Sequence, residues 1–264
     1  MKPTLYTARQ LDEPITLSYE AGIAALREGE LDTEHGIMRF GSNYTFLMTV
    51  RHNDNELLAI YKPRAGEAPL WDFASGTLCH RETAAFVLSE ALGWNFVPPT
   101  ILREDAPRGI GSLQLFINHD PSQHYFRFEK RHLDQIYRFF AFDIIVNNAD
   151  RKGGHVLLDE EDHVWGIDHG LCFNHVPKLR TVMWEFGKNS EIVLGGEPIP
   201  DDILVDLKKL SAILNSPDNA VCGQLQPLLA TNEMNALRRR LDRLIASGCF
   251  PAPGPGNNRP WPAV

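Results

Sequence analysis

Alternating apolar and polar positions in the first part of the chain predict four β-strands. Two apolar runs, at 45–50 (TFLMTV) and 57–62 (LLAIYK), are joined by the polar segment RHNDNE and are typical of a hairpin. Two further runs, at 96–102 (FVPPTIL) and 111–117 (GSLQLFI), flank the polar loop REDAPRG. We expect these four segments to form a small antiparallel sheet.

Helical spacing separates the two pairs of strands and dominates the rest of the chain. The apolar residues between Leu78 and Leu92 fall mainly on one face, which predicts a helix that ends at Gly93. Residues 132–148 are apolar on nearly every side, as is typical of a buried helix. Further helices are expected at 16–28, 201–215 and 231–247.

Together these elements predict an α+β fold with two lobes. Residues 1–120 would form an N-lobe built on the antiparallel β-sheet, and residues 121–250 a mainly helical C-lobe. The segment 251–264 (PAPGPGNNRPWPAV) is rich in proline and glycine, so we expect a flexible tail.

Composition and charge argue against several classes of protein. The net charge of −8 disfavours nucleic acid or anionic lipid as a broad partner. The basic run at 237–244 (LRRRLDRL) is typical of a solvated helix face. No apolar run approaches the ~20 residues that span a bilayer, and the first ten residues lack the apolar core of a secretory signal. The four cysteines form no Cys-x-x-Cys pair, so we expect free thiols and a cytoplasmic location.

Three features of the N-lobe suggest phosphate chemistry. Gly41, Ser42 and Asn43 form a turn of small residues, which would let backbone N–H groups approach phosphate oxygens. Lys62 ends an apolar strand, and Glu82 lies on the sheet-facing side of the predicted helix. A carboxylate on a buried face needs a cationic partner, so we expect an ion pair between Glu82 and Lys62.

The segment 147–170 (NNADRKGGHVLLDEEDHVWGIDHG) places two aspartates on either side of a predicted hairpin. Asp150 could orient an acceptor hydroxyl and take its proton, and Lys152 could neutralise a phosphoryl group in transfer. Asp168 follows the second strand of the hairpin and is a natural magnesium ligand, because magnesium prefers one or two carboxylates plus phosphate oxygens.

The order of these features is typical of a kinase-type phosphotransferase. The motifs YKP (61–63), RETAAFVLSEALGW (81–94), FDIIVNNADRKGGH (142–155) and IDHGLCF (167–173) resemble the phosphatidylinositol 3-/4-kinase superfamily. Within it, the chain looks most similar to type II phosphatidylinositol 4-kinases and their bacterial relatives. The resemblance covers roughly 35–175 and implies a protein-kinase-like fold that binds ATP and Mg²⁺, or Mn²⁺ in its place.

The resemblance also implies a role for each matching residue. Lys62 would hold the ATP phosphates with Glu82 bracing it, Asp150 would be the catalytic base, and Asp168 would bind the metal. The remaining nucleotide contacts would come from the phosphate loop and the hinge beside the adenine, namely Gly41, Ser42, Asn43, Gln114, Leu115, Phe116 and Ile117.

Three departures from the family pattern are visible. His155 stands where the family has an asparagine that binds the second metal ion, and imidazole suits manganese better than magnesium. His169 occupies a position where many kinases have phenylalanine. The cysteine-rich palmitoylation segment of eukaryotic type II enzymes is absent, which removes the main reason to expect membrane attachment. The segment after Phe173 carries only Lys178, Arg180 and Lys188, so a membrane lipid is a less expected acceptor.

Several functions remain open from the sequence. We favour an ATP-dependent kinase that phosphorylates a hydroxyl of a protein or a small molecule. A nucleotide-binding pseudokinase and a nucleotidyl transferase on the same fold are alternatives. A metal-dependent hydrolase is a third class, and it would use Asp168 with His155, His163, His169 and His175.

Overall fold

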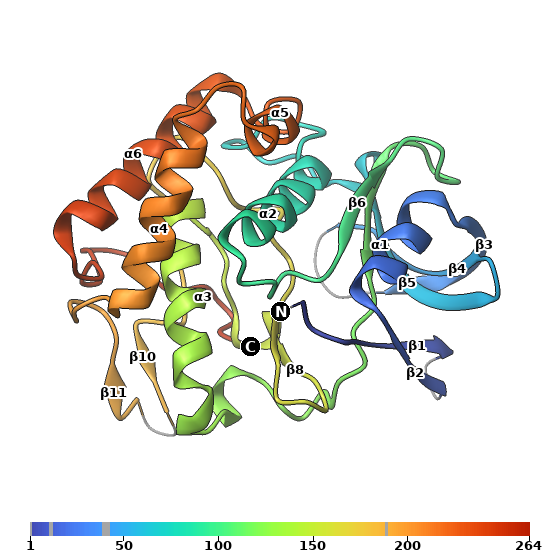
Figure 1. The fold of residues 1–264 in the computed structure, drawn as a ribbon, viewed down its shortest axis with the longest axis horizontal. Helices are drawn as coiled ribbons and strands as arrows, with labels where there is room; N and C mark the ends of the chain where they lie inside the picture. Colours follow the sequence, from blue (N-terminus) through green and yellow to red (C-terminus); the bar gives the residue numbers. More distant parts are fainter. Residues whose placement is uncertain (1, 11–12, 39–42, 188–189) are drawn as a thin grey trace.

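A five-stranded antiparallel sheet forms the smaller lobe of the protein (Figure 1). The computed structural model describes residues 2–10, 13–38, 43–187 and 190–264. The strands are arranged in the order β3-β4-β5-β7-β6. Their bounds are Glu30–Met38 (β3), Thr45–His52 (β4), Asn55–Pro63 (β5), Thr100–Arg103 (β6) and Gly111–Leu115 (β7).

Strand register decides which side chains of the sheet reach the candidate site. Within β5, Ile60 pairs with Gln114 and Lys62 pairs with Ser112, so these side chains share one face. Leu115, on the opposite face, packs beside Gly22 of helix α1 (Tyr19–Glu28). Helix α2 (Leu78–Leu92) meets the Lys62 face and lies between the two lobes in Figure 1.

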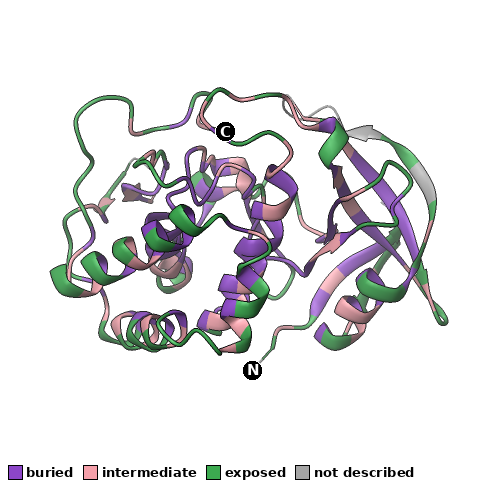
Figure 2. Cartoon of the chain, turned by 90° about the horizontal axis from the view of Figure 1, so that it is seen from above, coloured by how far each residue is buried: buried purple, intermediate pink, exposed green. Residues whose placement is uncertain are grey.

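Helices form most of the larger lobe. Their bounds are Leu133–Val146 (α3), Asp201–Leu214 (α4), Ala220–Leu225 (α5) and Thr231–Ser247 (α6). Figure 2 shows the buried residues gathered in the interior and the exposed residues on the outer faces of the peripheral helices. As predicted, α3 is buried: Phe139 and Phe142 are inaccessible, and Phe96 stacks on Phe139 at 4.1 Å between ring centroids.

Short elements complete the larger lobe. The strands β8 (Val156–Leu158) and β9 (Val164–Gly166) form the predicted hairpin, and β10 (Glu185–Phe186) pairs with β11 (Ile192–Val193). Single turns of 3₁₀-helix lie at Arg64–Gly66 (η1), Tyr125–Arg127 (η2), Lys130–His132 (η3) and Gly153–His155 (η4). The predicted α+β class and its division into a sheet lobe and a helical lobe are confirmed.

Several predicted boundaries are wrong for identifiable reasons. The strand expected at 96–102 begins only at Thr100, because Pro98 and Pro99 have no N–H to donate to the sheet. The helix expected from residue 16 begins at Tyr19, where the Ser18 hydroxyl accepts a hydrogen bond from Ala21 N at 3.2 Å. Strand β7 ends at Leu115 instead of residue 117.

Other elements were not predicted at all. An N-terminal hairpin of β1 (Leu5–Gln10) and β2 (Glu13–Leu17) precedes α1, and the sequence pattern also missed β3 and α5. The segment 251–264, expected to be flexible, runs along the larger lobe, and its residue Pro260 is buried. The basic run on α6 is not simply solvated, because Arg240 Nε donates to Ile145 O at 2.7 Å and Arg238 Nε donates to Leu214 O at 2.9 Å.

Candidate active site

Three of the predicted site residues meet between the lobes. Lys62 Nζ forms an ion pair with Glu82 Oε1 and lies 3.1 Å from Asp168 Oδ1. The Glu82 side chain is only 3% exposed, whereas that of Asp168 is 49% exposed. One ammonium group therefore joins a buried carboxylate of the helix to an open carboxylate of the loop after β9.

The backbone around Asp168 fixes this arrangement. His169 N donates a hydrogen bond to Glu82 Oε2 at 2.9 Å, so both carboxylate oxygens of Glu82 are engaged. Asp168 itself has φ of +59°, a left-handed conformation that non-glycine residues adopt rarely. Gly170 lies against α2, where a Cβ atom would be 3.5 Å from Glu82 Oε1.

The charges of the site keep Asp168 ionised and Lys62 protonated. The Lys62 ammonium beside Asp168 holds the pKa of that carboxyl far below its usual range. Burial opposes the charge of Lys62, but Asp168 and Glu82 outweigh it and raise the pKa of the ammonium. The open carboxylate can therefore meet a cation at neutral pH without first losing a proton.

The loop after α3 carries the second predicted aspartate. Asp150 Oδ2 lies 3.3 Å from Lys152 Nζ, and Asp150 N donates to Asn148 Oδ1 at 3.0 Å. Burial raises the pKa of Asp150, although Lys152 opposes the shift. A half-buried carboxylate with a raised pKa is suited to accept a proton.

His155 stands beside Asp168. Its Nε2 lies 3.4 Å from Asp168 Oδ2, and burial lowers the pKa of the imidazole to about 4. Lys152 N points at Nδ1 from 3.4 Å, so the neutral ring carries its proton on Nε2, toward Asp168. His155 therefore borders the predicted metal ligand as a neutral ring.

A buried arginine that sequence analysis did not single out ties the two loops together. Arg151 is fully buried and its Nε lies 3.1 Å from Asp143 Oδ1. Its two terminal nitrogens donate to Ile167 O at 2.8 Å and to His169 Nε2 at 2.6 Å. Arg151 therefore links the loop of Asp150 to the loop of Asp168. The sequence did offer a signal for this role: Arg151 comes soon after the strongly apolar segment 132–148, where a charged side chain needs a buried partner.

The predicted phosphate loop is described only in part. Gly41 and Ser42 lie outside the described residues. Asn43 precedes β4, and its Oδ1 accepts a hydrogen bond from Ala68 N at 2.7 Å. That contact fixes the end of the loop against the segment that follows Lys62.

Of the four predicted hinge residues, Gln114 and Leu115 lie on β7, which pairs with the Lys62 strand β5, and Phe116 and Ile117 come directly after β7. Gln114 Nε2 donates to Thr100 Oγ1 at 2.8 Å, so this side chain fastens β7 to β6. Leu115 and Ile117 are buried in the core, while Phe116 is half-buried and packs near Leu58 and Ile60 on the Lys62 face. Gln114 and Phe116 are therefore the predicted hinge residues whose side chains lie on the Lys62 face.

The histidines of the alternative hydrolase do not assemble into a metal site. Among the residues that the structure describes, no group of three or more His, Cys, Asp or Glu side chains could hold a metal ion. His169 is buried against Arg151, and His163 Nε2 lies 3.1 Å from Asn95 O.

All four cysteines are free, as the sequence predicts.

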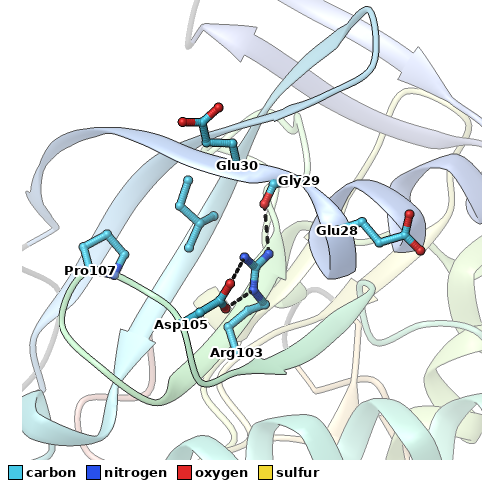
Figure 3. A pocket seen from close by; sticks show the side chains of 7 residues that line it. Glu28, Gly29, Glu30, Arg103, Asp105 and Pro107 are labelled. Carbon is cyan, nitrogen blue, oxygen red and sulfur yellow. Dashed lines mark hydrogen bonds and ion pairs between the residues drawn. The ribbon is translucent and has the colours of Figure 1, made fainter.

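Two cavities lie away from these residues. One, of about 340 Å³, lies at the edge of the sheet lobe, where Arg103 contacts Gly29 O and Asp105 (Figure 3). Arg103 is already engaged within the fold, because its Nε and Nη2 donate to Asp105 and its Nη1 donates to Leu26 O near the end of α1. The other cavity, of about 410 Å³, lies between the start of α2 and the α5–α6 loop.

Comparison with known proteins shows the family of the chain. The family model for phosphatidylinositol 3- and 4-kinase matches residues 31–202, well over half of the chain. Protein Rv2133c of Mycobacterium tuberculosis is 38% identical over 276 residues, which cover 91% of this chain and 94% of the relative. Phosphatidylinositol 4-kinase gamma 4 of Arabidopsis thaliana is 30% identical over 136 residues.

The plant relative is much longer: the match covers 46% of this chain but 24% of that protein. Among solved structures, the Helicobacter pylori proinflammatory kinase CtkA is similar with a TM-score of 0.48 and 14% identity, over 84% of this chain and 93% of that one. No helix within the described ranges is long and apolar enough to cross a membrane. The family match includes Lys62, Glu82, Asp150 and Asp168, and the chain belongs to the phosphatidylinositol 3- and 4-kinase family.

Proposed function

We propose that the chain is an ATP-dependent phosphotransferase that moves the γ-phosphoryl group of ATP to a hydroxyl group. The observation that carries this proposal is the position of Lys62, whose ammonium joins buried Glu82 to exposed Asp168. A lysine fixed in this way is suited to hold phosphate oxygens, while the exposed carboxylate beside it is suited to a cation.

Each neighbouring residue has a distinct part in the proposed transfer. The acceptor oxygen attacks the γ-phosphorus, the bond to the β–γ bridging oxygen breaks, and ADP leaves with that electron pair. Asp150 takes the hydroxyl proton, for which its raised pKa is favourable. Lys152, 3.3 Å from Asp150, balances negative charge on the phosphoryl group in transfer.

The chain's residues fit a hard divalent cation. Asp168 offers a carboxylate that is 49% exposed and kept ionised by Lys62, and magnesium prefers such oxygen ligands. Bound Mg²⁺ would neutralise phosphate charge, and Asp168 would hold it with His155 beside it. Manganese is the alternative, because it tolerates an imidazole nitrogen better.

The acceptor is proposed to be a protein or small-molecule hydroxyl. The segment after Phe173 offers few cations for a polyanionic headgroup, and Lys178 is already paired with Asp72 at 2.7 Å. The plant relatives are named as phosphatidylinositol 4-kinases, but this chain spans only a fraction of their length. A lipid acceptor is therefore the less favoured choice.

The test is to incubate the purified protein with ATP and Mg²⁺ or Mn²⁺ and to separate the nucleotide products. ADP supports the proposal. Asp168→Ala is expected to abolish metal-dependent ATP binding, whereas Asp150→Ala should retain binding and lose transfer. If Asp150→Ala turns over ATP like the parent, Asp150 is not the base.

One observation favours a second candidate. His155 contacts Asp168 at the place where the resembled family has an asparagine, and this would suit a nucleotide-binding pseudokinase. Tight ATP binding without turnover in either metal, across a panel of acceptors, would support that reading. AMP and pyrophosphate as products would instead indicate nucleotidyl transfer.

A further inference from the structure

The last residues of the chain lie against the loop that carries Asp150. Figure 1 shows the C-terminus close to the β8 region, in the middle of the molecule. Ala263 O accepts a hydrogen bond from Gly153 N at 2.7 Å, and Val264 lies within 4.0 Å of the position that a Cβ on Gly154 would take. We call residues 258–264 the strap and residues 150–155 the catalytic loop.

The strap is anchored at its other end as well. Asn258 O accepts hydrogen bonds from Thr181 N at 3.1 Å and from Trp184 Nε1 at 2.9 Å. Arg259 pairs with Glu185 at 3.0 Å, and Pro260 is buried. The strap thus runs from the 181–185 segment to the catalytic loop.

Thr181 connects the strap to the buried support of the same loop. Its hydroxyl donates to Asp143 Oδ2 at 3.1 Å, and its backbone bridges to Arg151. Asp143 in turn pairs with Arg151 inside the catalytic loop. The strap therefore contacts the loop directly at Gly153 and indirectly through Thr181.

The catalytic loop needs such support because of its composition. Gly153 and Gly154 lie between Lys152 and His155, and two consecutive glycines leave the backbone unusually free. In the structure, Gly153 is enclosed between the ring of Phe126, only 2.6 Å from where a Cβ would be, and Ala263 O of the strap. Lys152 reaches Asp150 and His155 reaches Asp168 from either side of this pair.

We propose that the strap is a positioning element of the candidate active site. By holding Gly153, it fixes Lys152 beside Asp150 and His155 beside Asp168. This inference rests on the proposed phosphotransferase function for its catalytic part, but the contact between strap and loop can be tested without any activity.

The first test ends the chain after Trp261, which removes Ala263 O and leaves the anchors at Asn258, Arg259 and Pro260. Hydrogen exchange of the Gly153 amide, measured without nucleotide, is expected to accelerate at least tenfold. In the turnover assay, kcat should fall at least tenfold while KM for ATP changes less than twofold, because Lys62 is untouched.

A second variant tests the strap without shortening the chain, in case the truncated protein does not fold. Arg259→Ala loosens the strap at the surface without shortening it and should accelerate Gly153 exchange at least twofold. Arg9→Ala, which breaks the exposed pair with Glu13 in the other lobe, is the matched control and should leave Gly153 exchange unchanged.

The outcomes separate the two proposals. Unchanged Gly153 exchange in both strap variants overturns the inference, and so does faster exchange with unaltered kcat. If the parent protein turns over no ATP, the proposed function fails, and Gly153 exchange in the two strap variants alone decides whether the strap holds the loop.

Discussion

Two ionic networks lie within one small region of this protein, and they differ in how completely they are closed. In the first, Asp143 and Arg151 are both inaccessible. Asp143 accepts from Arg151, from Asn148 at 3.0 Å and from Thr181 at 3.1 Å. In the second, Lys62 joins buried Glu82 to Asp168, whose side chain is half exposed.

This difference in exposure separates a network that stabilises the loops from one that can still bind a ligand. A buried pair with every oxygen engaged can hold loops together but has no capacity left for a ligand. The Lys62 network keeps one carboxylate open and ionised, and this is what a phosphate-bound cation requires. Both networks meet at His169, whose backbone N–H binds Glu82 and whose ring accepts from Arg151.

The largest effect is expected from breaking the closed network. Asp143→Ala would leave the Arg151 charge buried without its partner, and such a loss typically destabilises a protein by about 3–5 kcal/mol. The free energy of unfolding in urea measures this directly. The double variant Asp143→Leu with Arg151→Met should lose less, since no uncompensated charge remains. A loss below about 1 kcal/mol for Asp143→Ala would contradict a structural role for the pair.

Breaking the open network should chiefly affect turnover. Lys62→Ala removes the ammonium proposed to hold the ATP phosphates, so kcat/KM for ATP should fall by about a hundredfold to a thousandfold. Its loss of stability should be smaller than for Asp143→Ala, because water can hydrate exposed Asp168, and buried Glu82, whose pKa burial raises, can take up a proton and keeps its hydrogen bond from His169 N. Lys209→Ala, which removes an exposed ion pair with Asp206, is the control and should keep parental turnover. Equal turnover in both variants would rule out the assigned role of Lys62.

The smallest effect concerns pH and His155, which borders the open network. Its pKa of about 4 lies below the 6.5 of a free histidine, so the unfolded state binds more protons between these values. Stability should therefore decrease as the pH falls from 6.5 toward 4, with a contribution from His155 of about 2 kcal/mol between pH 7 and pH 5.

The variant His155→Asn isolates this contribution. Urea unfolding at pH 7 and pH 5 should show a smaller loss of stability in the variant than in the parent, while buried His169 still contributes a loss in the same direction. His175→Asn changes an exposed histidine and serves as the control. An identical pH dependence in His155→Asn and the parent would show that His155 is not held neutral by the fold.

Sequence by itself determined several of the helices and strands and the order of the candidate site residues. Apolar periodicity located β4, β5, α2, α3, α4 and α6, because a half-buried strand or helix repeats its apolar positions locally. The position of Glu82 on the buried face of its helix predicted a cationic partner, and the structure places Lys62 there. The motifs around Asp150 and Asp168 indicated the family, which the comparisons show.

Only the tertiary structure decided what surrounds those residues. Arg151 looked like one more polar residue of a loop, yet it is the buried connection between both aspartate loops. Likewise, a Pro/Gly-rich segment more than 100 residues away in sequence supplies the carbonyl that holds Gly153. Periodicity reports which side of an element is buried, but it carries no information about which distant segment covers it. Those partners depend on where the chain returns in space, and burial then determines whether a charge supports the fold or remains open to a ligand.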